Sequence, residues 1–453
     1  MLTLLAFVLA LGILIAVHEY GHYRVAVACG VKVLRFSVGF GKPLLRWQSP
    51  TSGTEFVLAA FPLGGYVRML DEREAPVPAE QRHLAFNTQS LRARAAIVAA
   101  GPLANLLLAI FLYAGVNWTG IDEPVARLAS PVPGSVAQQA GLQGGDWVRN
   151  AAIGTEELRP VRSFEDLRWL LTQAALDTTS IRLEVQSAEG ARLRSVLLPL
   201  EQLDVREADA QLLRKVGIVS PWTRPVIGGV SPDGAAWRAG LREGDLILQV
   251  GAVEVVDGQQ LRDLIRNSVR AGQPIAQTWR LQRAGQVLML EVRPDLVTEP
   301  AGAVARIGAY VGAPPELITV EYGLGESLWH GATRTWDVSL LSLRMMGRMV
   351  IGEASLKNLS GPLTIADYAG RSASMGLTQY LLFLALISVS LGVLNLLPLP
   401  VLDGGHLMYY LWEGVTGKGV SDAWMERLQR GGVALLLLMM SIALFNDITR
   451  LLG

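Results

Sequence analysis

The sequence predicts a multi-pass α-helical membrane protein with four transmembrane helices, a membrane-associated β-hairpin or sheet element, and two α+β domains outside the membrane. Three observations support this. Four long apolar segments lie along the 453 residues, 51% of the residues are hydrophobic while 18% are charged, and part of the central region is repeated. The apolar segments indicate membrane helices, and the charged residues indicate polar domains beside them.

The four apolar segments are expected to cross the membrane at residues 1–27, 95–117, 376–400 and 431–450. A spanning helix needs about 20 mostly apolar residues, and the second and third segments meet this length directly. The first is long enough only if it continues through residues 25–27, and the fourth needs its flanks. The first has neither a basic leading stretch nor a small-residue cleavage site, so we expect it to stay in the mature protein.

Basic residues predict the orientation, because cytoplasmic loops of membrane proteins are enriched in lysine and arginine. The ends of the central region 117–379 hold few basic residues. The loop between the first two helices holds Arg24, Lys32, Arg35, Lys42, Arg46, Arg68, Arg73, Arg82, Arg92 and Arg94, and the last loop holds Lys418, Arg427 and Arg430. We therefore expect these two loops in the cytoplasm, and both termini and the central region outside, which in a bacterium is the periplasm.

Residues 28–94 are expected to form a β element and a linker on the cytoplasmic side. The stretches "VKVLRFSVGFGKPLLRW" (31–47) and "TEFVLAAFPLGGYVRML" (54–70) alternate like strands and turn at glycines. Open sheet edges cannot face lipid, so this element must lie at the interface, in a cavity or against protein.

The central region contains an internal repeat with a period of 99 residues. "VPGSVAQQAGLQGGDWV" (132–148) aligns with "SPDGAAWRAGLREGDLI" (231–247). This spacing predicts two tandem domains, at 118–222 and 223–312, followed by a linker or interfacial helix at 313–375. Each copy reads as strand, helix, AGLxxGD turn, strand and second helix.

The repeated pattern resembles the PDZ domain in its circularly permuted bacterial form. Such domains bind extended peptides or C-termini by adding a strand to a sheet edge. Gly217 and Ile218, before the second copy, match the short glycine-hydrophobic loop that precedes that edge. The alternative is that both domains only block access and bind no peptide.

The first apolar segment ends in an HExxH motif formed by His18, Glu19 and His22. On a helix, positions i and i+4 share a face, so both imidazoles can bind one Zn²⁺ ion. Glu19 lies beside that position and can accept a proton from the attacking water. A soluble helix with two surface histidines is the alternative, but ionisable groups in a membrane helix are costly and usually functional.

A catalytic zinc usually has three protein ligands, so a third ligand must come from elsewhere. The segment "NLLPLPVLDGGHL" (395–407) supplies Asp403 in a turn that follows two prolines. An ordinary Asp-Gly turn is the alternative, but the first and third helices both run toward the cytoplasm and end at the same membrane face. Residues 401–430 are then the cytoplasmic loop that carries Asp403, and His406 is an alternative ligand or a partner of one.

These motifs together resemble the site-2 protease family of intramembrane zinc metalloproteases, and in particular its bacterial members with two tandem PDZ domains. The "GPLAN" of residues 101–105 matches the family's GxxxN-type motif. The resemblance implies one catalytic zinc ion, bound by His18, His22 and Asp403, with Glu19 as general base. It also implies that substrate contacts Asn395, Pro398, Pro400 and the Gly39-Phe40-Gly41 stretch. Asn395 could instead be a helix-capping residue before the break.

The resemblance implies an enzyme of the bacterial inner membrane that cleaves membrane-spanning substrates in contact with the lipid bilayer. Its expected substrates are an anti-sigma factor of the envelope stress response, already trimmed on its periplasmic side, and remnant signal peptides. The PDZ pair would admit only trimmed substrates. A net charge of zero gives no indication of a nucleic-acid partner. Two alternatives are a non-proteolytic membrane scaffold that presents PDZ domains, disfavoured by the intact Glu19, and a zinc transporter, disfavoured because the fourth helix lacks metal-binding residues.

Overall fold

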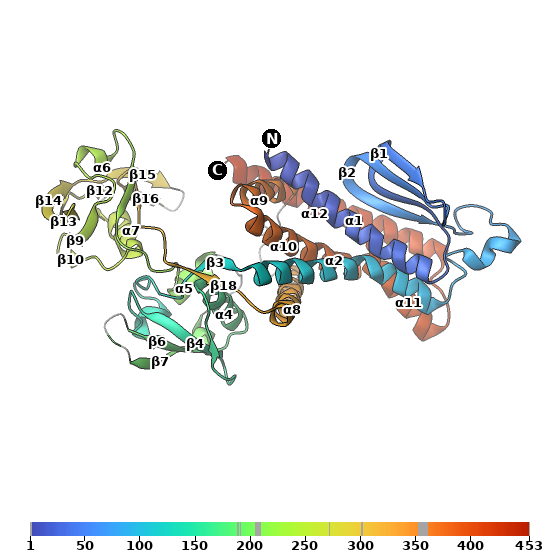
Figure 1. The fold of residues 1–453 in the computed structure, drawn as a ribbon, viewed down its shortest axis with the longest axis horizontal. Helices are drawn as coiled ribbons and strands as arrows, with labels where there is room; N and C mark the ends of the chain where they lie inside the picture. The colour runs from blue at the N-terminus through green and yellow to red at the C-terminus, as the bar shows by residue number, and fades with distance from the viewer. Residues whose placement is uncertain are drawn as a thin grey trace. The chain divides into compact units, whose positions relative to one another are not determined.

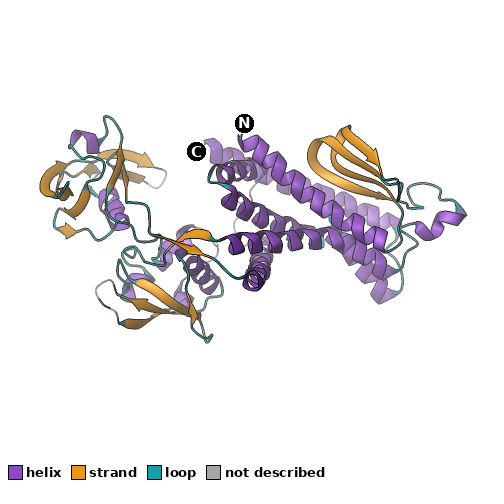
Figure 2. Cartoon of the chain, viewed as in Figure 1, coloured by secondary structure: helices purple, strands orange, loops and turns teal. Residues whose placement is uncertain are grey.

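The chain divides into two units, which are described separately. The membrane unit comprises residues 1–121 and 321–453, and the inserted unit comprises residues 122–320. The computed structural model describes residues 2–187, 190, 192–203, 210–270, 272–299, 302–351 and 361–452. Figure 1 follows the chain by residue number, and Figure 2 separates the helices from the strands.

Four helices of the membrane unit are long and apolar enough to cross a membrane, which confirms the predicted number among the described residues. They are α1 (Leu2–Ala28), α2 (Leu91–Thr119), α10 (Leu377–Asn395) and α12 (Asp422–Leu452). α2 begins four residues before the expected span at 95, because Ser90 caps it by accepting a hydrogen bond from the backbone N–H of Ala93. α10 ends at Asn395 rather than at 400, before the two prolines that cannot continue a helix.

Small residues let the membrane helices approach closely. A side chain at Gly21 of α1 would overlap the backbone carbonyl of Ala100 in α2, and one at Gly392 of α10 would press against Leu106 and the carbonyl of Pro102. Without a hydrophobic driving force between helices in lipid, such contacts and interhelical hydrogen bonds hold the bundle. The hydroxyl of Tyr380, for example, donates to the carbonyl of Ala6 at 2.7 Å.

Among the residues that the structure describes, the membrane unit has three further α-helices: α8 (Leu324–Val350), α9 (Pro362–Ser374) and α11 (Asp403–Thr416). α8 packs against α2 at Gly331, while Trp329 and Trp336 are 69% and 70% exposed. One face of α8 is thus packed against α2 while another exposes tryptophans. This fits the interfacial helix expected within 313–375, whose place at the membrane interface stays a prediction. Asp447 of α12 accepts hydrogen bonds from the first backbone N–H groups of α9 and so joins these two helices.

The β element consists of two long bent strands, β1 (Val33–Gln48) and β2 (Glu55–Met69), followed by the short helix η1 (Ala79–Leu84). Arg35 pairs with both Glu55 and Arg68, and Phe56 pairs with both Phe36 and Trp47. Each strand therefore folds back, and four antiparallel segments lie side by side in the order 43–48, 55–59, 33–40 and 65–69. The last segment is an edge to which no other strand of the described residues pairs.

The inserted unit contains two four-stranded antiparallel sheets, one in each repeat copy, with the strand orders β5-β4-β6-β7 and β10-β9-β13-β14. The elements of the first copy are α3 (Val136–Gln139), β4 (Trp147–Ile153), β5 (Arg159–Pro160), α4 (Phe164–Leu176), β6 (Ile181–Gln186), β7 (Leu193–Leu198), η2 (Leu200–Gln202) and α5 (Ala210–Val216). Those of the second are β8 (Ile227–Val230), α6 (Ala235–Arg238), β9 (Leu246–Val250), β10 (Val253–Glu254), α7 (Gly258–Arg266), β11 (Val269–Arg270), β12 (Gln273–Pro274), β13 (Gln277–Arg283), β14 (Gln286–Val292), β15 (Asp295–Glu299), β16 (Gly302–Arg306) and β17 (Ala309–Val311). Two more strands, β3 (Ile121–Pro124) and β18 (Leu317–Val320), pair where the chain enters and leaves this unit.

The aspartate of the repeated AGLxxGD turn makes equivalent contacts in both copies. Asp146 and Asp245 are buried, and each accepts a hydrogen bond from the backbone N–H three residues before it. Each also pairs with an arginine of its own sheet, Arg194 in the first copy and Arg283 in the second. The repeat therefore preserves an ion pair between a buried aspartate and a partly exposed arginine, which closes the turn against the sheet. The PDZ assignment of both copies stays a prediction.

The Gly217-Ile218 loop belongs to the first copy and not to the second. The backbone N–H of Val132 donates to the carbonyl of Gly217 at 3.1 Å, and the matching contact in the second copy joins Ser231 to Gly308 at 2.8 Å. Gly217 has a φ of +99°, and a side chain there would overlap Ser135. The sequence suggested a position before the second copy because the loop precedes it along the chain. The hydrogen bond instead joins this loop to Val132, 85 positions earlier.

Candidate metal centre

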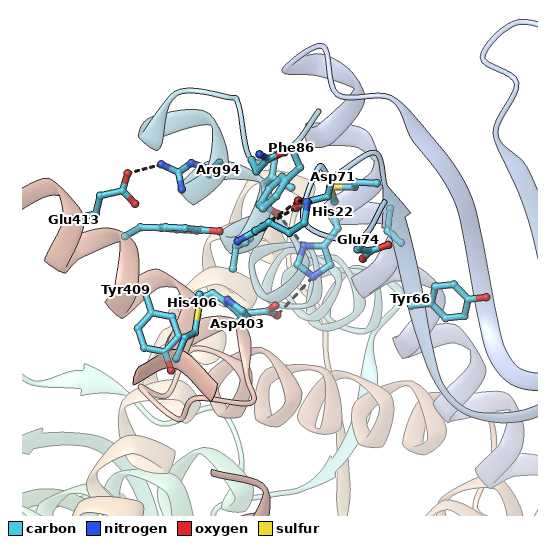
Figure 3. A pocket seen from close by; sticks show the side chains of 18 of the residues that line it. His22, Tyr66, Asp71, Glu74, Phe86, Arg94, Asp403, His406, Tyr409 and Glu413 are labelled. Carbon is cyan, nitrogen blue, oxygen red and sulfur yellow. Dashed lines mark hydrogen bonds and ion pairs between the residues drawn. The ribbon is translucent and has the colours of Figure 1, made fainter. Parts of the chain in front are cut away.

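His18, Glu19 and His22 lie in the last part of α1, as predicted. The imidazoles of His18 and His22 are one helical turn apart, on one face, with their ring centroids 4.8 Å from each other. Both rings and the carboxylate of Glu19 line one cavity of 730 Å³ in the membrane unit. Figure 3 shows His22 projecting into this cavity toward α11.

Asp403 is the first residue of α11 and reaches the two histidines from the opposite side. After α10 ends, residues 396–402 turn back, and the first turn of α11 packs directly on this backbone. A side chain at Gly404 would overlap the carbonyls of Leu396 and Leu397, and one at Gly405 would overlap that of Leu399. The two glycines therefore permit the tight reversal that points Asp403 at α1.

Three possible ligand atoms meet in this cavity at nearly equal spacing. His18 Nε2 lies 3.2 Å from His22 Nε2 and 3.3 Å from Asp403 Oδ2, and His22 Nε2 lies 3.6 Å from the same carboxylate oxygen. Atoms bound tetrahedrally to zinc at about 2.0–2.1 Å lie roughly 3.3 Å from one another. The donor set and its spacing therefore fit one zinc ion. Among the described residues, these three form the one group of histidine, cysteine or acidic side chains close enough to share an ion.

The charge state of Asp403 suits this arrangement. Burial disfavours its ionised form, but hydrogen bonds and charge interactions with His18 and His22 outweigh burial and lower its pKa to about 2. His406 lines the same cavity, but it is not part of the three-residue group. Burial lowers the pKa of His406 and so favours its neutral imidazole.

Helix α2 contacts the His22 ring on the side that faces away from Asp403. The Nδ1–H of His22 donates to the backbone carbonyl of Ile97 at 2.8 Å, which leaves Nε2 free to face Asp403. A side chain at Gly101 would overlap the His22 imidazole, so this glycine provides the space that the ring occupies. The glycine of the GPLAN stretch is therefore required, because any larger side chain at position 101 would collide with the His22 ring.

The edge segment 65–69 of β2 lines the cavity through Gly65, Tyr66, Val67 and Met69. A side chain at Gly65 would overlap the Cγ atom of Glu19, so the strand passes directly against α1 at the predicted general base. Sequence reasoning missed this segment because it treated Gly64-Gly65 as a turn. The pair of glycines was the only indication in the sequence that this segment lies close to another element, because glycines in a strand can also mark a close backbone approach.

The residues predicted from the sequence to contact substrate are not among those that line the cavity. Gly39 and Gly41, with φ values of +89° and +90°, form the bend of β1 around the half-exposed Phe40, which stacks on Tyr66. Asn395 is the last residue of α10, and Pro398 and Pro400 lie in the reversal before Asp403.

An ion pair between α2 and α11 was also missed from the sequence. Arg94 donates to Glu413 at 2.6 Å, and its guanidinium lies 5.0 Å from the centre of the Tyr410 ring. Figure 3 shows this pair among the residues that line the cavity. The contact fixes α11 against α2 at a point ten residues from Asp403, and nothing in the spacing of Arg94 and Glu413 along the chain could have revealed it.

Comparison with known proteins agrees with this geometry. The model of peptidase family M50 matches residues 6–439. A protein of Ralstonia nicotianae named "Putative zinc metalloprotease" is 44% identical over 100% of this chain and 99% of its own length. The regulator of sigma E protease of Salmonella typhi is 39% identical over 99% of both chains, and the regulator of sigma-E protease RseP of Escherichia coli is 39% identical over 99% of this chain and 98% of its own.

Proposed function

Since this chain belongs to peptidase family M50, the site-2 protease family, and is a zinc metalloprotease of the membrane, we propose that it cleaves membrane-spanning segments of other proteins. The observation that carries this proposal is the spacing of 3.2–3.6 Å between His18, His22 and Asp403. This group lies between the end of one membrane helix and the reversal after another. A peptide bond must therefore come to the site from the membrane.

Each polar residue of the site has a proposed task. His18, His22 and Asp403 would hold the zinc ion, which would supply Lewis acidity near neutral pH. Glu19 would accept a proton from the attacking water and pass it to the leaving amine, since this residue lines the same cavity. Asn395 stabilises the developing oxyanion or holds the substrate backbone, and Pro398 and Pro400 border its path.

The substrate must be unwound before it can be cleaved, because a helix hides its peptide bonds in its own hydrogen-bond ladder. The free edge of segment 65–69 can pair with an extended substrate by main-chain hydrogen bonds. This edge passes against Glu19, so a strand added to it would lie beside the general base. We assign the Gly39-Phe40-Gly41 bend to shaping this sheet, with exposed Phe40 available to contact substrate side chains.

We also propose where the protein lies in the cell and which substrates it cleaves. The chain lies in a bacterial inner membrane, with the inserted unit and both termini in the periplasm and the site near the cytoplasmic face, as the loop charges favour. Two relatives are named for regulation of sigma E, so an anti-sigma factor is the proposed substrate, with remnant signal peptides as a further class. The PDZ-like pair acts as a size filter, and the Gly217-Ile218 loop is its proposed peptide site.

Removal of zinc tests the core of the proposal. Purified protein in detergent should stop cleaving a model transmembrane substrate after dialysis against a chelator, and one equivalent of Zn²⁺ should restore cleavage. Mg²⁺ should not restore it, because imidazole ligands suit zinc and Mg²⁺ prefers oxygen ligands. Cleavage that persists in protein shown by elemental analysis to be free of zinc would contradict the proposal.

Three matched substrates test the size filter. We expect rapid cleavage of a transmembrane segment with a short outer tail and slow cleavage of the same segment fused to a folded outer domain. A third substrate with a flexible polar extension of equal mass should be cleaved rapidly, because a flexible chain can pass where a folded domain cannot. Equal initial rates for all three substrates, measured in proteoliposomes, would refute the filter and leave the protease assignment intact.

A further inference from the structure

The amide of Asn105 presents a hydrogen-bonding conflict at the back of His18. Asn105 lies on α2, is 1% exposed, and places Nδ2 3.5 Å from Nδ1 of His18. Its other end, Oδ1, is buried and has no hydrogen-bond partner among the described residues. A buried carbonyl oxygen without a partner is destabilising, so this arrangement of the two side chains needs an explanation.

The direction of the His18 ring shows which partner it requires. Its Nε2 faces His22 and Asp403, so Nε2 is the atom that offers its lone pair to the metal. A neutral imidazole that ligates through Nε2 carries its proton on Nδ1, which makes Nδ1 a donor. The NH₂ group of Asn105 is also a donor, so the two cannot bond as they face each other. Rotation of the amide by about 180° exchanges its oxygen and nitrogen and brings Oδ1 to Nδ1–H.

The neighbouring ligand already shows the same arrangement. The Nδ1–H of His22 donates to the carbonyl of Ile97, eight residues before Asn105 on the same face of α2. One buried side of α2 therefore offers an oxygen acceptor to each histidine, with Gly101 between them giving room for the His22 ring. The backbone of Asn105 is itself anchored, because Ser388 of α10 donates to its carbonyl at 2.7 Å.

We propose that Asn105 is a positioning residue that accepts the Nδ1–H of His18 at Oδ1 and thereby holds His18 in its metal-binding tautomer and orientation. This inference rests on the proposed function only in taking His18 as a zinc ligand. Through this bond the amide raises the affinity of the site for zinc, in the way that acceptors behind ligating histidines usually do.

Two nearly isosteric substitutions separate this role from simple packing. Asn105→Asp keeps an oxygen acceptor toward His18 and loses the amide donor, whereas Asn105→Leu keeps the volume and loses both. In full-length protein purified in detergent, zinc affinity would be measured by competition with a chromophoric chelator. We expect Asn105→Leu to weaken zinc binding by about 10- to 100-fold and Asn105→Asp to retain it. The visible spectrum of the cobalt-substituted protein should change in Asn105→Leu and stay tetrahedral in Asn105→Asp.

The controls distinguish the possible failures. The thermal midpoint of the zinc-free protein shows whether each variant folds, and Asn105→Asp remains informative if Asn105→Leu does not. Wild-type zinc affinity in folded Asn105→Leu, or equal loss of affinity in both variants, would overturn the positioning role. His18→Ala should abolish tight zinc binding; if it does not, the proposed ligand set fails, independently of the result at Asn105.

Discussion

Replacement of Glu19 by glutamine is expected to stop proteolysis while zinc stays bound. Glutamine has nearly the same size and shape, so the packing of α1 against Gly65 should persist. It cannot accept a proton from water, and loss of a general base typically lowers the rate by about 10²–10⁴-fold. The three residues proposed to hold zinc are unchanged, so the zinc content by elemental analysis should match that of the wild type, while cleavage of a model transmembrane substrate falls by this factor.

Glu74 provides a matched control for this experiment. Its carboxylate lines the same cavity but pairs with Arg68 at the surface, so Glu74→Gln should leave the cleavage rate close to wild type. If Glu19→Gln cleaved at the wild-type rate, Glu19 would not be the base. If it lost its zinc instead, its role would be structural, and the separation of metal binding from proton transfer proposed above would be wrong.

The meeting of His22 and Asp403, 381 positions apart, could be foreseen because the membrane reduces the possible topologies. Apolar length identified the spanning helices, and the prolines identified where α10 must end. Two helices that run in the same direction end at the same face, so the two motifs had to lie at one depth. This physical constraint has no counterpart in a soluble chain, where motifs so distant in sequence could lie anywhere.

The supporting residues could not be foreseen, because each depends on a contact between elements that leaves no periodic pattern. The pairing of β1 with β2 decides that segment 65–69, and not the Gly39–Gly41 bend, forms the edge beside Glu19. Likewise, the rotation of α2 about its axis decides that Asn105 faces His18. Hydropathy predicts that such helices and strands exist, but register and rotation come from side-chain packing.

The Gly217-Ile218 loop illustrates a related limit in the inserted unit. Its sequence shows a glycine followed by an apolar residue, which fits many turns. The hydrogen bond between Gly217 and Val132, with the neighbouring bridge between Leu128 and Pro221, shows that the first copy closes on its own C-terminal end. Gly308 makes the same contact with Ser231 and is therefore the equivalent position in the second copy. The alignment of the AGLxxGD turns alone did not identify it.

Replacement of Asp403 by asparagine is expected to remove tight zinc binding. The carboxylate is anionic at neutral pH because its pKa is lowered to about 2, and an amide supplies neither this charge nor an equally strong ligand. Loss of one of three protein ligands should weaken binding by more than the roughly 10- to 100-fold typical of residues that only support a ligand. A bound ion present at 100 times its dissociation constant stabilises the folded state by about 2.7 kcal/mol, so zinc should raise the thermal midpoint of the wild type but not of Asp403→Asn.

Two comparisons make this result decisive for the third ligand. Asp71 lines the same cavity and is bound by Arg73, so Asp71→Asn tests the same chemical change away from the histidines and should keep the zinc-dependent rise in thermal midpoint. His406→Ala tests the alternative ligand on α11 and should also keep it, since His406 lies outside the three-residue group. A zinc response preserved in Asp403→Asn but lost in His406→Ala would transfer the third position to His406. The reversal after α10 would then serve to place the imidazole, one turn further along α11, rather than the carboxylate at its start.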